Sequence, residues 1–166
     1  MLELNRISAG YGKQTVLDGI SVDFEKGKLT SIIGVNGCGK STLLKAILGI
    51  LSLSNGEIFI DGENLLTISR NEIAKKIAYL SQGKNIPDMT VEQMVLHGRF
   101  PYLSYPRRYS SHDREVAIKA MEIVGVAEFA HKPLYSLSGG MRQNAYIAMA
   151  LAQDTDYILL DEPTTY

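Results

Sequence analysis

Residues 34–41 read Gly-Val-Asn-Gly-Cys-Gly-Lys-Ser, and this stretch decides the fold. It fits the pattern G-x-x-x-x-G-K-[ST] and stands between a short apolar run, residues 29–33, and a segment of helix-forming composition, residues 40–51. A buried strand, a glycine loop and a helix in this order allow backbone N–H groups and the helix N-terminus to surround a phosphate chain. The four fixed positions coincide rarely by chance. We therefore predict a phosphate-binding loop and not an ordinary glycine turn.

Two side chains of this loop carry the expected chemistry. Lys40 would reach the β- and γ-phosphates of a nucleoside triphosphate, and the Ser41 hydroxyl would coordinate Mg²⁺. The Cys38 thiol could be oxidised near a bound nucleotide, although a small tolerated residue is the simpler interpretation of this variable position. The predicted nucleotide-binding residues of the loop are Gly34, Val35, Asn36, Gly37, Cys38, Gly39, Lys40, Ser41 and Thr42.

Two acidic residues, Asp161 and Glu162, follow a second apolar run at residues 157–160. Ligands collect beyond the carboxyl ends of parallel strands. There an aspartate can hold Mg²⁺, and a neighbouring glutamate can orient and deprotonate the water that attacks a γ-phosphate. Such a pair by itself is more often a turn or a helix cap, but the loop upstream favours catalysis.

A second helix start suited to an anion lies at residues 137–140, Leu-Ser-Gly-Gly. Ser138 can cap a helix, while Gly139 and Gly140 expose N–H donors. The alternative is an ordinary capping serine followed by flexible glycines.

Composition bounds the possible functions. A chain of 166 residues with 45% hydrophobic and 21% charged side chains has the size and balance of one globular domain. Its net charge of −1 gives no global attraction to nucleic acid or to an acidic membrane surface. One cysteine excludes an internal disulfide framework and fits a reducing compartment. The start lacks a signal-peptide pattern and no apolar run is long enough to span a bilayer, so we expect a cytosolic protein.

Periodicity predicts a mixed α/β order. Apolar alternation and short apolar runs predict strands at residues 2–8, 20–24, 29–33, 57–60, 77–80 and 157–160. Asn55-Gly56 and Asp61-Gly62 read as turns around the fourth of these strands. Capping-box patterns predict helices beginning after Ser69 and Thr90, and further helices are expected around residues 116–124 and 140–152.

Residues 98–111 are the least regular stretch and mix aromatic with basic side chains. They contain Phe100, Tyr102, Tyr105 and Tyr109 among Arg99, Arg107 and Arg108. Such interleaving could stack on nucleic acid bases. Because the stretch has the length of a loop and two prolines interrupt it, we favour a surface or partner-contact loop.

The order of these motifs resembles that of ATP-binding cassette (ABC) ATPases: the P-loop, Gln82 after a strand, Leu-Ser-Gly-Gly, and Tyr-Ile-Leu-Leu-Asp-Glu-Pro-Thr. The resemblance implies an α/β fold, a P-loop NTPase (RecA-like) core with an antiparallel β subdomain and an inserted helical subdomain. It divides a single partial domain, residues 1–166, into three parts. These are the β subdomain and P-loop core (1–84), the helical subdomain with the signature motif (85–152), and the return to the core with the Walker B strand (153–166).

In that family two cassettes pack head to tail, and each ATP lies between one P-loop and the signature motif of the other subunit. The resemblance assigns Ser138, Gly139 and Gly140 to the partner's γ-phosphate. It assigns Gln82 to Mg²⁺, to the attacking water and to sensing the permease. Tyr11 matches the aromatic residue that stacks on adenine, with a packed strand tyrosine as the alternative. Met141 replaces the family's glutamine or glutamate, so its backbone donor is expected to bind nucleotide.

Further stretches, residues 98–102, 113–115, 147–155 and 163–166, are similar to importers of iron–siderophore complexes, with haem and cobalamin importers close behind. The resemblance implies an ATPase subunit with ATP and Mg²⁺ as cofactors, lying peripherally at the cytoplasmic face of the membrane. Its partners would be a second ATPase subunit, transmembrane permease subunits and, indirectly, a periplasmic or lipoprotein solute-binding protein, with no nucleic acid.

Three alternatives remain: a soluble ABC-superfamily ATPase of translation or DNA repair, the ATPase of another ABC transporter, and a nucleotide-binding module without catalysis. The absence of heptads between Gly34 and Asp161 argues against the repair type. The intact loop and acidic pair argue against a non-catalytic module.

The family pattern continues beyond residue 166 with an aspartate loop, a core strand and a switch histidine. His97, His112 and His131 all precede Asp161, so none of them matches that histidine. We therefore expect the C-terminal part of the core to be missing, leaving the strands at 29–33 and 157–160 without their shared neighbour. We also expect the parent protein to hydrolyse ATP and residues 1–166 alone to do so inefficiently.

Overall fold

The computed structural model describes residues 1–81 and 86–161. The chain forms two compact units, Met1–Ile73 and Ala74–Tyr166, and each unit is described by itself.

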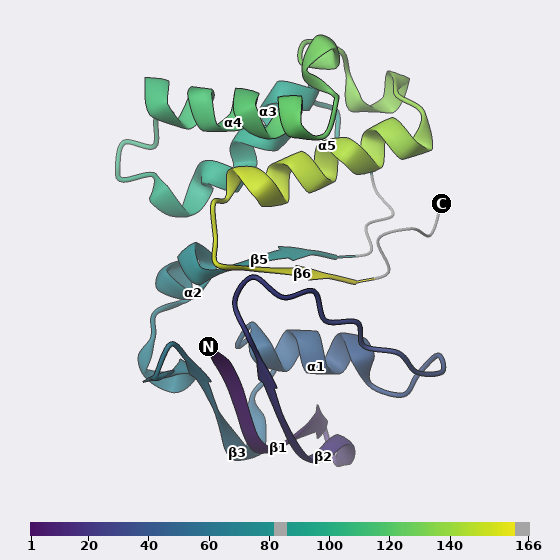
Figure 1. Cartoon of the computed structure of the whole chain (residues 1–166), viewed down its shortest axis with the longest axis vertical. Helices are drawn as coiled ribbons and strands as arrows, with labels where there is room; N and C mark the ends of the chain where they lie inside the picture. Colours follow the sequence, from purple (N-terminus) through teal and green to yellow (C-terminus); the bar gives the residue numbers. More distant parts are fainter. Residues whose placement is uncertain (82–85, 162–166) are drawn as a thin grey trace. The chain divides into compact units, whose positions relative to one another are not determined.

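The first unit is built on an antiparallel sheet (Figure 1). Among the described residues the strand order is β2-β1-β3-β4, with bounds β1 Leu2–Tyr11, β2 Gln14–Phe24, β3 Leu53–Ile60 and β4 Glu63–Asn64. Apolar side chains of β1 and β3 fill the core of this unit: Leu2, Leu4, Ile7, Ala9, Ile58 and Ile60. The predicted antiparallel strands at residues 2–8 and 20–24 are confirmed, and both extend beyond the predicted bounds.

The turn predicted at Asn55-Gly56 is wrong, because both residues lie inside β3. The register between β1 and β3 shifts between Asn5 and Ser8, and Gly56 takes a φ of +81° opposite that shift. A Cβ on Gly56 would overlap the carbonyl oxygens of Asn5 and Arg6. Gly56 therefore marks a β-bulge in which two backbones approach closely. Glycine is used in both bulges and turns, so its presence alone does not distinguish them.

Helix α1 (Lys40–Ile47) buries Leu43, Leu44, Ala46 and Ile47. The predicted apolar face is present, but the helix ends four residues before residue 51. Gly49 has a φ of +65°, and its N–H donates to the Ala46 carbonyl at 3.0 Å. A left-handed glycine just past the last turn terminates a helix.

The strand predicted at residues 29–33 is not formed, and this prediction is wrong for the described chain. Leu29 is 97% exposed and Ile33 is 92% exposed. A buried strand exists only where neighbouring strands satisfy its backbone, and no strand of the described residues pairs with this run. The run is apolar, as a buried strand would be, but an apolar composition does not provide a neighbouring strand to pair with.

A 3₁₀ turn, η1 (Leu65–Thr67), and helix α2 (Arg70–Lys76) follow the first sheet. The Glu72 N–H donates to the Ser69 hydroxyl at 3.2 Å, so α2 begins where the capping pattern predicted.

In the second unit, β5 (Ile77–Leu80) and β6 (Tyr157–Leu160) pair in parallel, and both predicted strands are confirmed. Three α-helices lie between these strands in the sequence: α3 Val91–Leu96, α4 Ser111–Ile123 and α5 Gly139–Ala152. The 3₁₀ turns of this region are η2 His97–Tyr102, η3 Ala127–Phe129 and η4 Leu134–Ser136. Thr90 and Gln93 form the predicted reciprocal capping box at the start of α3. Helix α5 packs against β5 (Figure 1).

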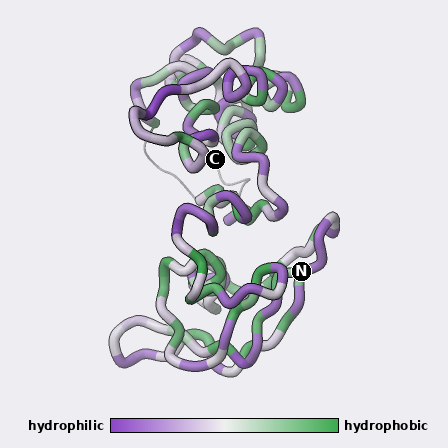
Figure 2. The backbone as a smooth tube through the Cα atoms, turned by 90° about the vertical axis from the view of Figure 1, so that its left-hand side faces the viewer, coloured by the Kyte–Doolittle hydropathy of each residue, from purple (hydrophilic) through white to green (hydrophobic). Residues whose placement is uncertain are grey.

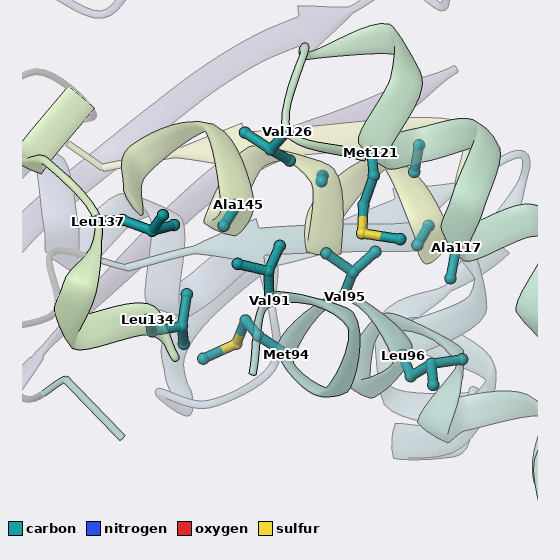
Figure 3. Packing of buried hydrophobic residues seen from close by; sticks show 13 residues of the cluster. Val91, Met94, Val95, Leu96, Ala117, Met121, Val126, Leu134, Leu137 and Ala145 are labelled. Atoms are coloured by element: carbon teal, nitrogen blue, oxygen red, sulfur yellow. The ribbon is translucent and has the colours of Figure 1, made fainter. Parts of the chain in front are cut away.

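The three helices enclose a core of buried side chains, shown in Figure 3. Figure 2 shows hydrophobic and hydrophilic residues alternating along these helices, as expected for helices that bury one face. The cluster comprises Val91, Met94, Val95, Leu96, Ala117, Ala120, Met121, Val126, Leu134, Leu137, Ala145, Ala148 and Ala152. The helical region predicted from residue 90 to 152 therefore has its own core, while the subdomain boundaries at residues 84 and 152 stay predictions.

A buried ion pair joins the helices of this unit. Arg99 in η2 is 4% exposed and Asp113 in α4 is 6% exposed; Arg99 Nε donates to Asp113 Oδ1 at 3.0 Å. Arg99 also donates to the carbonyl of Ala152, the last residue of α5, at 3.0 Å. Burial alone would raise the pKa of Asp113, but hydrogen bonds from Ser110 and the Arg99 charge lower it below its ordinary value. The prediction that Arg99 belongs to a surface loop is therefore wrong, because its side chain is buried in this ion pair.

Within residues 1–81 and 86–161, no helix combines the length and apolar composition that a bilayer-spanning segment needs.

Candidate functional site

The glycine loop turns sharply before α1. Gly37 has a φ of +81° and Gly39 a φ of +101°, and α1 begins at the next residue, Lys40. A Cβ on Gly39 would lie 3.1 Å from Val16 Cγ1 and 3.3 Å from Leu17 Cδ2. Glycine is required here both by the positive φ and by close packing on β2. The loop therefore presents its backbone at the N-terminus of α1, as anion binding needs.

Lys40 holds its ammonium group against the start of the same loop. Nζ donates to the Gly34 carbonyl at 2.9 Å and to the Val35 carbonyl at 3.0 Å. The Cys38 N–H donates to the Val35 carbonyl at 3.3 Å, which closes the loop on itself. Residues 34–38 are exposed, so the ammonium and the loop backbone face a region that a ligand can enter.

The next two residues differ in burial. Ser41 is exposed in the first turn of α1, whereas Thr42 is 8% exposed. The nucleotide contact predicted for Thr42 stays a prediction.

Tyr11 ends β1 with 49% of its surface exposed. Lys45 of α1 places Nζ 5.9 Å from the centre of the Tyr11 ring. This distance lies at the outer limit of a cation–π contact. Tyr11 is therefore not a packed core tyrosine. Its ring is accessible on the same unit as the loop, as the adenine-stacking prediction requires, although that role stays a prediction.

Asp161 directly follows β6 and is 9% exposed. Its N–H donates to the Leu80 carbonyl at 3.0 Å, which continues the β5–β6 ladder to the end of the sheet. The Tyr79 hydroxyl donates to Asp161 Oδ2 at 3.3 Å. The predicted catalytic partners Gln82 and Glu162 lie outside the described residues.

The signature motif begins α5. Ser138 is the N-cap, and its hydroxyl accepts from the Met141 N–H at 3.3 Å. The predicted backbone donor of Met141 is therefore engaged in the cap, and the Met141 side chain packs against the helical core. Gly140 is exposed, and a Cβ added there would meet nothing within 4 Å.

The structure distributes the predicted residues over the two units. The loop residues and Tyr11 belong to the first unit; Asp161, Ser138, Gly139, Gly140 and Met141 belong to the second. No group of three or more His, Cys, Asp or Glu side chains that could hold a metal occurs in the described part of the chain. The metal-ligand roles predicted for Ser41 and Asp161 stay predictions. Hydroxyl and carboxylate oxygens are the donors that Mg²⁺ prefers.

Sequence reasoning missed three side chains. Lys45 gave no motif signal, although its position five residues after Lys40 places it on the helix that carries the loop. Tyr79 read as an ordinary strand residue. Arg99 had one usable signal, because Ser110 and Asp113 form a helix start that leaves a carboxylate available for pairing.

A glycine loop at a helix N-terminus with a lysine folded over it, and a buried aspartate at the end of a parallel strand, define a P-loop nucleotide-binding protein. The family model described as "ABC transporter" matches residues 17–165, and the chain belongs to this family. Membership of this family accounts for the α/β fold with its antiparallel sheet, and it means that this domain binds nucleotide.

Curated relatives share about two fifths of the sequence. The petrobactin import ATP-binding protein FpuD of Bacillus anthracis is 43% identical over 99% of this chain and 61% of its own length. The iron(3+)-hydroxamate import ATP-binding protein FhuC of Bacillus subtilis is 42% identical over 99% and 62%. The ferric enterobactin transport ATP-binding protein FepC of Escherichia coli is 41% identical over 97% and 60%. The chain thus spans about three fifths of the length of these relatives.

Solved structures agree with the fold. The ADP conformation of the ATP-binding cassette MJ1267 superposes with a TM-score of 0.87 at 27% identity, covering 99% of this chain and 69% of that one. An inward-facing ABC transporter of the metal-chelate type gives a TM-score of 0.83 at 32% identity, covering 98% and 61%.

Proposed function

We propose that the protein containing this chain is the ATP-binding and ATP-hydrolysing subunit of an ABC importer that takes up an iron–siderophore complex. The observation that carries the ATPase proposal is the loop geometry, with Lys40 Nζ 2.9 Å from the Gly34 carbonyl at the N-terminus of α1. Membership of the ABC transporter family supports it.

Each residue has a defined task in this proposal. The loop backbone and Lys40 bind the β- and γ-phosphates, and Tyr11 stacks on adenine. Ser41 and Asp161 hold Mg²⁺, which when bound offsets phosphate charge. Glu162 orients the attacking water and accepts its proton, and Gln82 contacts that water.

The complete site requires two subunits. Ser138, Gly139 and Gly140 stand at the start of a helix, with Ser138 and Gly140 exposed, which suits the γ-phosphate of ATP held by another copy or a homologous subunit. Gly140 lies in the first turn of α5, and a Cβ there would meet nothing within 4 Å, so its backbone is open to the close approach of a ligand.

The transported solute is proposed from the relatives, whose names specify petrobactin, iron(3+)-hydroxamate and ferric enterobactin. Two of these names specify ferric iron, as iron(3+)-hydroxamate and ferric enterobactin. The protein would act at the cytoplasmic face of the membrane, bound to transmembrane permease subunits that receive the complex from a solute-binding protein. The ATPase itself would not touch the chelate.

Glu162→Gln in the full-length protein tests the hydrolysis step. The variant should bind ATP with wild-type affinity, because the side chain keeps its size, and should lose turnover by about 10²-fold or more, because the amide cannot accept the proton. Binding is measured with a fluorescent ATP analogue and turnover by phosphate release. Unchanged turnover would remove Glu162 from its assigned role.

Solute identity needs a transport measurement. Vesicles containing the permease and the full-length ATPase, together with the solute-binding protein, should accumulate a ⁵⁵Fe-labelled siderophore when ATP is supplied, and the Glu162→Gln protein is the matched control. Accumulation of cobalamin or haem in place of the ferric chelates would reassign the solute without affecting the ATPase proposal.

A further inference from the structure

The carboxyl ends of β5 and β6 bring an unassigned phenol onto the proposed metal ligand. Tyr79 pairs with Leu159 in the parallel ladder, and Asp161 continues that ladder by donating its N–H to the Leu80 carbonyl. Tyr79 is half-buried at this edge, and its hydroxyl donates to Asp161 Oδ2 at 3.3 Å. The contact thus spans the two strands at the point where ligands collect in parallel sheets.

A hydrogen bond to one carboxylate oxygen fixes the orientation of the carboxylate plane. Asp161 is 9% exposed, so its orientation is set by protein groups more than by solvent. Each carboxylate oxygen accepts more than one partner, which leaves coordination possible while the bond to Tyr79 persists. Moreover a phenol is neutral at physiological pH, so it orients the carboxylate without cancelling the charge that attracts a cation, as a lysine or arginine would.

We propose that Tyr79 is a positioning residue for the divalent cation held by Asp161: its hydroxyl holds the carboxylate in the orientation that coordinates the metal. The inference rests on the proposed role of Asp161 as a metal ligand. Partners that orient metal ligands contribute about 10–100-fold to metal affinity. A bond of 3.3 Å is long for an O–H donor, which places Tyr79 at the lower end of that range.

The test is Mn²⁺ binding to the full-length protein in the presence of a non-hydrolysable ATP analogue, measured by electron paramagnetic resonance. Tyr79→Phe removes only the hydroxyl and should weaken Mn²⁺ binding about tenfold. Affinity for the analogue in EDTA should be unchanged, because the phosphates and adenine do not contact Tyr79 in the proposal. A loss of analogue affinity in EDTA would show a structural role and overturn the inference.

Tyr157→Phe is the matched control. Tyr157 is 8% exposed and pairs with Ile77 at the opposite end of the same two strands. Its substitution deletes the same hydroxyl from the same sheet about 13 Å along the strand from Asp161. It should leave Mn²⁺ affinity at the wild-type value; a loss equal to that of Tyr79→Phe would overturn the inference.

Asp161→Asn separates failure of this inference from failure of the proposed function. If Asp161→Asn weakens Mn²⁺ binding and Tyr79→Phe does not, Tyr79 has no positioning role while Asp161 remains a ligand. If neither substitution changes Mn²⁺ binding, the metal role of Asp161 fails and the inference fails with it. Circular dichroism of each variant confirms that the measurements refer to folded protein.

Discussion

Gly140 lies in the first turn of a 14-residue helix, and a Cβ added there would meet no atom within 4 Å. Glycine in a helix costs conformational entropy, and exposed positions normally carry a residue with a better helix propensity. At Gly140 the absence of a side chain would let a triphosphate bound by another subunit approach the backbone, and this would offset the entropy cost. Stability and function therefore make opposite demands on one residue.

Gly140→Ala should raise the free energy of unfolding by about 0.5–1 kcal/mol, because alanine restricts the unfolded chain and favours the helix. The same methyl group should lower ATP turnover of the full-length protein, since it stands where the γ-phosphate of the partner's ATP would contact the helix start. Denaturant unfolding and phosphate release measure the two effects. Unchanged turnover in a stabilised variant would show that nothing approaches this backbone.

At the scale of elements, the β1–β3 pair contains a register shift opposite Gly56. Gly56→Ala should destabilise the protein by about 2 kcal/mol or more, because the Cβ meets the Asn5 and Arg6 carbonyls as well as adopting a left-handed φ. Gly62→Ala is the matched control, with the same φ of +81° and nothing within 4 Å. It should cost about 1–2 kcal/mol, the conformational part alone. Equal losses in urea unfolding would show that the bulge tolerates the side chain.

The helical region depends on the Arg99–Asp113 pair. Arg99→Met keeps the length of the side chain but leaves the Asp113 carboxylate buried without its cation, which should cost about 3–5 kcal/mol in the free energy of unfolding. Arg114→Met is the control, because its pair with Glu92 spans 3.6 Å and the Arg114 side chain is 55% exposed. That variant should change stability by about 0–1 kcal/mol.

Urea unfolding monitored by circular dichroism distinguishes the two arginine variants. A loss of under about 1 kcal/mol for Arg99→Met would mean that the buried Asp113 carboxylate does not depend on the Arg99 cation, contrary to this prediction. Asp113→Asn then provides an independent measure of the same contact.

Sequence predicted best those elements whose signals are local. Thr90 and Gln93 satisfy each other's backbone within one helical turn, so the pattern alone locates the start of α3. The run at residues 29–33 has the composition of a buried strand and forms none, because pairing depends on residues far away in the chain. Gly56 shows the same limit: its glycine signal was real, but only the register of β1 distinguishes a bulge from a turn.

The candidate site divides in the same way. The turns of the glycine loop and the start of α1 follow from consecutive residues, so local sequence predicted them, whereas the strand predicted before the loop is not formed. The contact between Tyr79 and Asp161 joins residues that are separated in the sequence by the whole helical region. A short sequence motif cannot predict a contact between residues so far apart in the chain. Arg99 was assigned to a basic surface stretch because its buried partner lies beyond the loop that follows it.

At the scale of the whole molecule, the proposal makes the nucleotide site a property of two subunits. In this proposal the P-loop and Tyr11 of one chain bind ATP, and the signature helix start of another chain completes the site. Two variants, each defective in one half, should therefore complement each other. Lys40→Ala removes the phosphate-binding ammonium, and Ser138→Arg places a large side chain at the exposed N-cap of α5.

Each full-length variant should hydrolyse ATP poorly by itself, because both sites of its homodimer are defective. After mixing and exchange of subunits, half of the dimers contain one of each, and every such dimer has one intact site. The mixture should therefore regain about one quarter of the wild-type sites, less any dependence of one site on the other. Phosphate release before and after mixing measures this recovery.

The matched control mixes Lys40→Ala with a chain that carries both substitutions, where no combination of subunits contains an intact site. This mixture should stay inactive. Recovery restricted to the first mixture requires that the loop and the signature act on one ATP from different chains. If neither mixture recovers although energy transfer between fluorescently labelled subunits shows that they exchange, the proposal of an independently active site shared by two chains is contradicted.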